Sequence, residues 1–412
     1  MVVTTMGRIR ERQPSARFLL MSYYPGPDRR LAEGSGVVVD DASPASLLIR
    51  YMPFALLCWV AGLLGLRWPD TLLPAAVRRL RACAGLLDVS GISFHDGRLG
   101  VLVYNVFCIW PALLLGVPVV HLSQARGPFA HVVNRVLARR FLGACRHSFA
   151  RGSATAAHME ELGLPTDRWS IAADIAFSFQ AGDSLTSEGE TEAQPVRAAL
   201  AAAAAEGRRV VAISPSSVVL GKTSRAGIDY VGILARAMER LHAAGYYLVV
   251  LPNATRAEGT GLRNNDIPVI EAIRDRLPEP LRMDQSAIGW ITFDVNTDVI
   301  RRLVEPCELI VTSRFHAMVA GLSVGTPVFV IGWSHKYGEV LEMFGCEQDA
   351  IDFAHLDAGL ESAIDAALGR SEETRARVIA SRPAVEASSI AQFDALKGLL
   401  GSRAQPVGGA RP

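Results

Sequence analysis

Short apolar runs alternate with helical stretches along most of this 412-residue chain. In its second half the runs fall near residues 209–214, 246–251, 289–292, 307–312 and 327–331. A continuous apolar run of about four to eight residues is typical of a strand that is buried on both faces. Strands of this kind, separated by helices, favour βα units around a parallel sheet. The pattern therefore predicts an α/β fold.

Both halves of the chain predict a Rossmann-like, doubly wound domain. In the first half, strands are expected near residues 17–22, 86–92, 117–122 and 147–150. Between the halves the sequence becomes rich in Gly, Ser, Thr and Glu, which is typical of an exposed connection. We expect an N-terminal domain over 1–180, a linker over 181–195, a C-terminal domain over 196–370, a helical segment over 371–402 and a disordered tail over 403–412. Such folds bind ligands at the carboxyl ends of their strands, so we expect a ligand in the cleft between the domains.

The N-terminal residues are charged and are predicted to be helical. A Rossmann-like half normally opens with a strand and a Gly-rich turn, whereas residues 7–13 precede the first plausible strand here. We therefore expect the first βα unit to be missing. Residues 1–13 also lack the apolar segment of a secretory signal, so we expect a cytoplasmic protein.

Two apolar segments approach the length of a membrane span. Residues 51–66 form a continuous apolar run that is shorter than the roughly 20 residues a spanning helix needs. Residues 101–120 are long enough, but Asn105, Pro111 and Pro118 interrupt them. A soluble protein is favoured. In the alternative, residues 51–66 make peripheral contact with a membrane, and the protein lies at its inner face.

Charge and cysteine content exclude several classes of protein. The formal net charge is +1, whereas a protein that binds nucleic acid through its phosphates normally carries a basic excess. The six cysteines are scattered and form no C-x-x-C pair, which argues against zinc ribbons and disulfide frameworks. We expect neither a nucleic-acid partner nor a metal site.

The strongest candidate site lies in residues 307–345. Ser313 is predicted to cap a helix whose first turn holds Arg314 and His316, directly after a buried strand. The next strand delivers His335 and Lys336 to the same edge of the sheet. Free N–H groups at a helix N-terminus, together with these cationic groups, favour a phosphate or carboxylate ligand. The structural alternatives are that Arg314 pairs with a carboxylate, His316 satisfies a helix end and Lys336 is solvated.

Weaker candidates follow other predicted strands. They are Gln124 and Arg126 after the strand near 117–122, Arg151 after the strand near 147–150, Asp174 near the linker, and Asn253 after the strand near 246–251. Arg126 is expected to face the cleft, and Asn253 to bind sugar hydroxyls. The alternatives are that Arg126 is an ordinary loop arginine, that Arg151 is a surface arginine and that Asp174 is a turn aspartate. For Asp266, close to Asn253, we expect helix capping.

Several of these motifs together resemble the polysaccharide pyruvyl transferase family. The second half contributes Ser313-Arg-Phe-His-Ala-Met318, Gly325-Thr-Pro327 and Gly332-Trp-Ser-His-Lys-Tyr-Gly-Glu-Val340. The first half contributes Asp88-Val-Ser-Gly91, Ser93-Phe94, Gln124, Gly127-Pro-Phe129, Arg151-Gly-Ser153, Glu161-Leu-Gly163 and Asp174 with Phe177. The resemblance implies a GT-B-like fold with a donor site in the C-terminal domain and an acceptor site in the N-terminal one. It also implies that Arg314 and His316 are the family's Arg-x-His motif.

The implied reaction moves a pyruvyl group from phosphoenolpyruvate onto two hydroxyls of a sugar and forms a cyclic ketal. The acceptor would be a polysaccharide or its lipid-linked oligosaccharide precursor, as in exopolysaccharide or cell-envelope synthesis. We expect no cofactor. His316 is the candidate general acid, Arg314 a bidentate clamp on the donor and Lys336 a supporting charge, with Asp174 or His335 as base. The alternatives are a glycosyltransferase with a nucleotide-sugar donor and a non-catalytic homologue.

Overall fold

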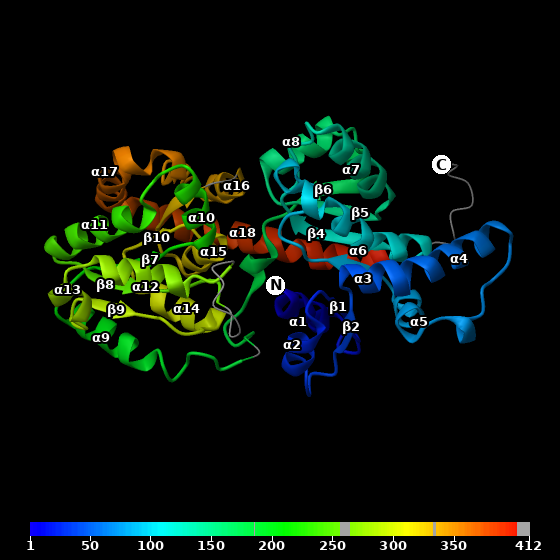
Figure 1. Ribbon diagram of the computed structural model, residues 1–412, viewed down its shortest axis with the longest axis horizontal. Helices are drawn as coiled ribbons and strands as arrows, with labels where there is room; N and C mark the ends of the chain where they lie inside the picture. Colours follow the sequence, from blue (N-terminus) through cyan, green and yellow to red (C-terminus); the bar gives the residue numbers. More distant parts are fainter. Residues whose placement is uncertain (185, 256–263, 333–334, 402–412) are drawn as a thin grey trace. The chain divides into compact units, whose positions relative to one another are not determined.

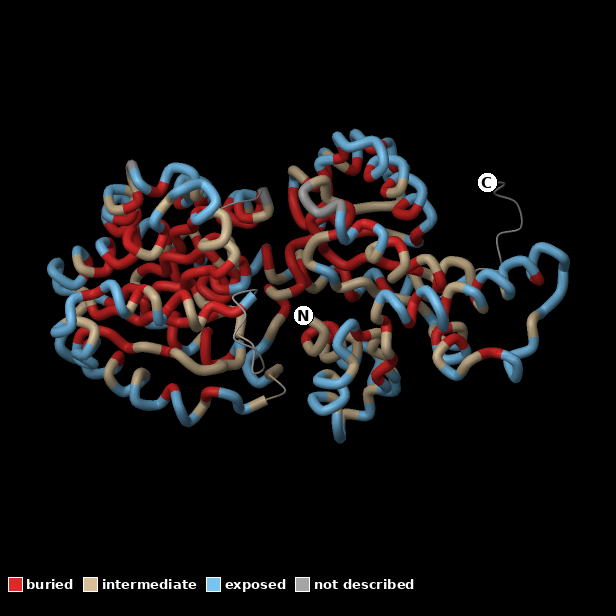
Figure 2. The backbone as a smooth tube through the Cα atoms, viewed as in Figure 1, coloured by how far each residue is buried: buried red, intermediate tan, exposed pale blue. Residues whose placement is uncertain are grey.

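The computed structural model describes residues 1–184, 186–255, 264–332 and 335–401 (Figure 1). The chain divides into two units. Unit 1 comprises Met1–Phe179 and Glu386–Pro412, and unit 2 comprises Gln180–Val385. Buried backbone is concentrated in the parallel sheets of both units (Figure 2).

Unit 2 is built on a six-stranded parallel sheet in the order β12-β11-β10-β7-β8-β9. Its strands are β7 (Val210–Ser214), β8 (Tyr247–Val250), β9 (Ile288–Trp290), β10 (Leu309–Thr312), β11 (Val328–Gly332) and β12 (Ala350–Asp352). Every residue of the central strands β7, β8 and β10 is buried. This explains why these strands are continuously apolar up to their ends, where β7 has Ser214 and β10 has Thr312, rather than alternating.

Helices cover both faces of this sheet (Figure 1). They are α9 (Gln194–Ala205), α10 (Ser217–Arg225), α11 (Tyr230–Ala243), α12 (Ile267–Arg276), α13 (Glu279–Met283), α14 (Thr297–Val304), α15 (Phe315–Val324), α16 (His335–Met343) and α17 (Leu356–Gly369). Successive residues of β10 point to opposite faces of the sheet. Val311 belongs to the apolar core that includes α11, α12 and α17, whereas Ile310 lies against α15.

Unit 1 has a smaller parallel sheet in the order β3-β4-β5-β6. Its strands are β3 (Leu86–Asp88), β4 (Val119–Gln124), β5 (His147–Ala150) and β6 (Trp169–Ile171). The surrounding helices are α1 (Val2–Arg12), α2 (Pro25–Leu31), α3 (Pro44–Ser46), α4 (Met52–Leu63), α5 (Ala75–Ala82), α6 (Leu102–Leu114), α7 (Val132–Ala144) and α8 (Ser153–Glu161). The α/β class with Rossmann-like parallel sheets is therefore confirmed.

A short βα unit near the N-terminus forms a sheet of its own. Strands β1 (Leu19–Ser22) and β2 (Val38–Asp41) pair in parallel on either side of α2. They form a separate two-stranded sheet and do not extend the four-stranded one. The expected first strand exists, but its partner β2 was not anticipated because its sequence, VVDD, is half acidic.

Helix α18 (Ser371–Leu400) contributes to both units. Its first part belongs to unit 2, and its part from Glu386 onward belongs to unit 1. There Phe393 packs in a core cluster with Val120 and Leu122 of β4, and the Gln392 side chain accepts a 2.9 Å hydrogen bond from the Ser123 N–H. The helical segment expected over 371–402 is therefore divided between the two units. The whole of the expected tail, 403–412, lies outside the described residues.

Gly321 lets α15 lie close to its sheet. A Cβ atom there would come within 2.4 Å of Ile310 Cδ1 on β10 and 2.9 Å of Val328 Cγ1 on β11. Both distances are too short for packed carbon atoms, so any side chain would push the helix away from the strands. The position of the N-terminus of α15 thus depends on a residue in the middle of the helix.

We expect Gly321→Ala to lower the free energy of unfolding by about 1–3 kcal/mol because it overpacks this contact. Gly338→Ala is the matched control, since Gly338 is also helical and a Cβ atom there meets nothing within 4 Å. That change should be neutral or stabilise the protein by up to about 1 kcal/mol. Urea denaturation measures both variants. Equal stability of the two variants would contradict the close packing of α15.

Candidate functional site

The candidate site lies where the strand order of unit 2 reverses. From β7 the chain proceeds through β8 to β9 on one side, and from β10 through β11 to β12 on the other. Strands β7 and β10 are neighbours, and their last residues, Ser214 and Thr312, are register partners. In open α/β sheets a crevice forms at the carboxyl ends of the strands at such a reversal. The loops that carry Ser217 and Arg314 therefore begin side by side.

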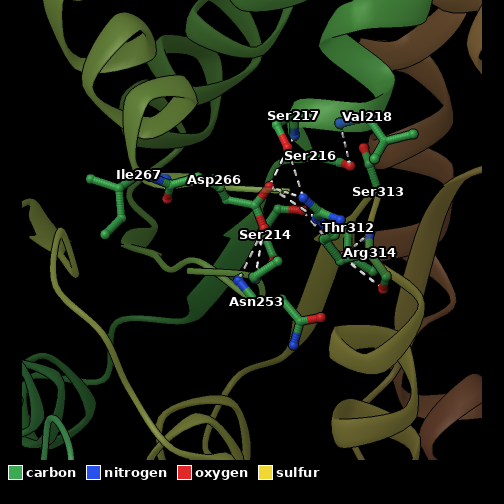
Figure 3. Close-up of polar contacts among 12 residues, drawn as sticks. Ser214, Ser216, Ser217, Val218, Asn253, Asp266, Ile267, Thr312, Ser313 and Arg314 are labelled. Atoms are coloured by element: carbon green, nitrogen blue, oxygen red, sulfur yellow. Dashed lines mark hydrogen bonds and ion pairs between the residues drawn. The ribbon is translucent and has the colours of Figure 1, made fainter. Parts of the chain in front are cut away.

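Arg314 lies at this point and is held by a carboxylate (Figure 3). It is the N-cap of α15, and its N–H donates to Thr312 Oγ1 at 2.9 Å. Its Nε donates to Asp266 Oδ1 at 2.9 Å, and its Nη2 contacts both Asp266 Oδ1 and Ser217 Oγ. The Nε and Nη2 edge of the guanidinium is therefore occupied by protein. This corrects our expectation that Arg314 clamps the donor through a free bidentate fork, and the carboxylate-pairing alternative describes the geometry.

Asp266 is fully buried and ties three loops together. Its carboxylate accepts hydrogen bonds from the N–H groups of Ser217 at 2.9 Å, Ala254 at 2.9 Å and Asn253 at 3.3 Å, besides the Arg314 side chain. It occupies the N-cap position of α12, but its side chain makes no capping bond to that helix. The expected capping role for Asp266 is therefore wrong. Asn253, which we expected to bind sugar, contributes its N–H to this cluster and lies beside it (Figure 3).

Ser313 is buried and does not cap α15, contrary to our prediction. Its Oγ lies 2.7 Å from the hydroxyl of Tyr230, and that hydroxyl also accepts a hydrogen bond from the Ser216 N–H. The Ser313 carbonyl accepts a 3.1 Å hydrogen bond from the hydroxyl of Tyr337. Burial raises the pKa of Tyr230 to about 12, so this phenol remains protonated and fixes the turn before Arg314.

The loops after β10 and β11 meet, as the sequence predicts. Lys336 at the start of α16 places its Nζ 5.1 Å from the ring centroid of Phe315. The rings of Phe315 and His316 are 5.4 Å apart, and His316 is exposed at the N-terminal end of α15. Two cationic or titratable groups thus lie close to a helix N-terminus, an arrangement that attracts anions. The side chain of His335 lies outside the described residues.

The residues that orient Arg314 were not predicted from the sequence. These are Asp266 and Ser217, with Tyr230 and Tyr337 behind Ser313. One signal was available. The loops after β7, β8 and β10 all open at the same edge of a parallel sheet, so a buried acidic residue in one loop is a natural partner for an arginine in another.

The first-half candidates lie at the carboxyl edge of the unit 1 sheet and are buried there. Arg126 is completely buried, and its guanidinium donates to the carbonyl of Phe149 at 3.1 Å and to Gln124 Oε1 at 3.2 Å. Gln124 Oε1 also accepts from Ser93 Oγ at 2.6 Å. Burial lowers the pKa of Arg126 to about 10. The expectation that Arg126 faces an open cleft is therefore wrong.

Arg151 and Asp174 form a buried ion pair in unit 1. Arg151 Nη1 lies 2.8 Å from Asp174 Oδ2, and both side chains are almost inaccessible. Asp174 Oδ1 also accepts a hydrogen bond from the Ala176 N–H and so caps a short helical turn over Ile175–Ser178. Asp174 is thus fully engaged within unit 1, which argues against it as the base.

A second pair, Asp88 and His121, joins β3 to β4, where the two residues are register partners. Asp88 Oδ2 lies 3.1 Å from His121 Nδ1, and His121 is completely buried. Burial disfavours the charged imidazole and lowers the pKa of His121 despite the nearby carboxylate. Burial also opposes ionisation of Asp88, but hydrogen bonds from His121 and Ser90 outweigh it and hold the pKa of Asp88 below its ordinary value.

Comparison with known families gives one match that covers most of the chain. A family model described as polysaccharide pyruvyl transferase matches residues 7–335. The matched region includes the whole first-half cluster around Arg126 and the Arg314-Phe-His316 segment. It ends at His335, the first residue of α16.

Several solved structures have a fold similar to that of this chain. A putative UDP-N-acetylglucosamine 2-epimerase from Listeria monocytogenes superposes with a TM-score of 0.56 at 11% identity, over 96% of this chain and 93% of that one. Anabaena HepE in complex with UDP-glucose gives a TM-score of 0.54 at 12% identity, over 96% and 94% of the chains. S. aureus MnaA, in a co-structure with UDP, gives 0.52 at 12% identity, over 93% and 97%. At these identities the similarity shows the fold, which is GT-B-like.

We expect Arg314→Ala to lower the free energy of unfolding of unit 2 by about 3–5 kcal/mol, because it leaves the buried Asp266 carboxylate without its cation. The double variant Arg314→Ala/Asp266→Asn should be more stable than Arg314→Ala, since no uncompensated charge remains. As a control, Arg302→Ala removes an exposed pair with Glu190 and should cost less than about 1 kcal/mol. Denaturant unfolding compares the variants, and wild-type stability of Arg314→Ala would disprove the pairing.

The lowered pKa of His121 predicts a loss of stability in mild acid. Above about pH 6.5 the imidazole is neutral in both folded and unfolded chains. Below that pH the unfolded chain binds a proton that the folded one excludes, so the free energy of unfolding falls by up to about 1.4 kcal/mol per pH unit.

His121→Gln should therefore make stability less dependent on pH between about 6.5 and 5. His131→Gln, at an exposed position of the same unit, is the control and should keep the wild-type slope. Thermal melts at several pH values measure the slopes. An unchanged slope in His121→Gln would show that this histidine is not held neutral by burial.

Proposed function

Because the chain belongs to the polysaccharide pyruvyl transferase family, we propose that it moves the pyruvyl group of phosphoenolpyruvate onto two hydroxyls of a sugar, forming a cyclic ketal. The observation that carries the proposal is that the matched region includes Arg314 and His316 at the strand-order reversal of unit 2. The acceptor in this proposal is a sugar of a polysaccharide or of its lipid-linked precursor, at the cytoplasmic face of a membrane. No cofactor takes part.

The donor carries a phosphate and a carboxylate, and the N-terminal end of α15 is suited to one of them. The positive end of the helix dipole attracts an anion to this position. Lys336, whose Nζ lies over the ring of Phe315, supplies a positive charge beside that turn. Asp266 offsets the charge of Arg314. We therefore assign Lys336 a main role in anion binding and not only the supporting role expected from the sequence.

Arg314 then acts mainly as an oriented hydrogen-bond donor. Asp266 and Ser217 hold its Nε and Nη2, and no described residue bonds to its Nη1. A guanidinium fixed on one edge loses little conformational entropy when its remaining nitrogen meets an anionic oxygen. Asp266 and Ser217 are positioning residues in this proposal, and Arg314 would contact the donor.

His316 is the candidate general acid. An exposed imidazole near neutral pH can hold a proton and deliver it to the methylene carbon of the donor as a sugar hydroxyl attacks C2. The attacking hydroxyl gives its own proton to the base, which replaces the proton that His316 delivered. The C2–O bond to phosphate then breaks, and the second hydroxyl attacks C2 and gives its proton to the leaving phosphate. The products are the cyclic ketal and inorganic phosphate, so atoms and charges balance. Because Asp174 is engaged in unit 1, His335 is the remaining candidate for the base, and this assignment stays a prediction.

A glycosyltransferase with a nucleotide-sugar donor is the second candidate. Structures similar to this chain were solved with UDP or UDP-glucose, and a helix N-terminus also suits a diphosphate. The two candidates differ in the ligand that stabilises the protein. A direct comparison of phosphoenolpyruvate with UDP-glucose and UDP-N-acetylglucosamine therefore separates them.

We expect phosphoenolpyruvate, and not the UDP-sugars, to raise the melting temperature. At a hundredfold excess over its Kd a ligand stabilises the native state by about 2.7 kcal/mol, which corresponds to several degrees. Lys336→Gln should lose most of this shift, whereas Lys397→Gln, an exposed lysine of unit 1, should keep it. His316→Gln should keep the shift and lose the release of phosphate in the presence of sugar acceptors. Stabilisation by UDP-sugars alone would favour the second candidate.

A further inference from the structure

One helix of unit 1 presents an apolar face that no described part of the chain covers. Residues 44–63 are continuously helical through α3, the π-helical turn Leu47–Tyr51 and α4, and this helix is long and apolar enough to cross a membrane. Leu47, Tyr51 and Ala55 recur every fourth residue and are completely buried in unit 1. The opposite side of the helix is exposed over most of its length (Figure 2).

The exposed side is apolar rather than polar. Its large side chains include Ile49, Leu56, Trp59, Leu63, Leu64 and Leu66, which we call the α4 apolar surface. Their exposed fractions run from 41% for Trp59 to 70% for Leu64. Single exposed apolar residues are normal on soluble proteins, but a run of them on one helix marks an interaction surface.

Charge identifies what this surface binds. Between Ala42 and Pro69 the only charged residues are Arg50 and Arg67, and both are exposed. Arg78 on the neighbouring α5 is also exposed, and none of these three arginines forms an ion pair with a described residue. An apolar helix face with unpaired basic residues at its borders is complementary to anionic lipid headgroups above an acyl layer.

We propose that the α4 apolar surface inserts into the boundary between headgroups and acyl chains of an anionic bilayer. The helix lies in the membrane surface and does not span it. Spanning would require Leu47 and Tyr51 to leave the core of unit 1 and would carry Arg50 into the hydrocarbon. Trp59 suits the interfacial position because its ring is apolar and its N–H is polar.

A second copy of the chain is a poorer partner for this surface. In a two-fold symmetric contact the same patch lies on both sides, so the exposed arginines of one copy would approach those of the other. The carboxylates that flank the segment are already engaged, Asp41 by Ser43 and Ser46 and Asp70 by Arg81. The membrane proposal concerns unit 1 alone, and it does not depend on which reaction the site in unit 2 catalyses.

The test is flotation of the full-length protein with vesicles of phosphatidylcholine, with and without phosphatidylglycerol. We expect the protein to float with the anionic vesicles and less with the neutral ones. Leu56→Glu/Leu63→Glu should weaken binding by at least about tenfold, because it places two charges on the inserted face. Val132→Glu/Val136→Glu, at exposed positions on α7, is the matched control and should float like the wild type.

Further variants test the contribution of the arginines, and melting temperatures show whether all variants are folded. Arg50→Gln/Arg67→Gln should lower binding to anionic vesicles and leave binding to neutral ones unchanged. All these positions are exposed, so the melting temperatures should match the wild type. Failure of the wild type to float, or equal loss in the α4 and α7 variants, would overturn the proposal. A dimer in solution that Leu56→Glu/Leu63→Glu dissociates, without vesicle binding, would assign the surface to a second copy instead.

Discussion

The parallel pairing of β7 with β10 is the constraint on which the candidate site depends. Both strands are buried on both faces, so their register is fixed by packing and not by a turn. Because the strands run in the same direction, the loops after Ser214 and Thr312 leave the sheet side by side. Each of these loops leads directly into a helix, α10 or α15. The sheet thus brings together two helix N-termini from segments almost 100 residues apart in the chain.

The charge of Arg314 is balanced inside the protein. Asp266 is buried, and its carboxylate accepts hydrogen bonds from four residues in three loops. It therefore holds these loops together inside unit 2 and is not part of an open surface. A buried pair of this kind contributes orientation more than net stability, because desolvation of both charges offsets their attraction. Attraction for an anion therefore comes chiefly from the end of α15, with His316 and Lys336 beside it.

The sequence was informative where local pattern decides the outcome. Continuous apolar runs predicted β4, β7, β8, β10 and β11, and the parallel arrangement predicted that Lys336 lies beside the first turn of α15, where its Nζ lies over the ring of Phe315. Strands β6 and β12 were not predicted, since each has three residues, lies at a sheet edge and lacks a buried apolar run.

Contacts between distant segments could not be predicted. Arg314 and Asp266 are 48 residues apart, and nothing in either local sequence specifies the pair. Arg126 shows the same limit, because a buried arginine held by main-chain and amide oxygens has the same local sequence as an exposed one. The sequence can place an arginine at the carboxyl edge of a sheet, next to the end of a strand. It does not identify the partner of that arginine, which determines whether the side chain binds a ligand or other protein groups.

Helix α18 has a consequence for the order in which the protein acquires its structure. Gln392 and Phe393, which complete the packing around β4, follow the whole of unit 2 in the chain. Domains generally fold as units, from the N-terminus onward, during synthesis on the ribosome. Here the first domain to emerge keeps part of its sheet uncovered until the second has been translated. The nascent chain therefore exposes the apolar side chains of Val120 and Leu122 for that interval, and this face is where a chaperone would bind.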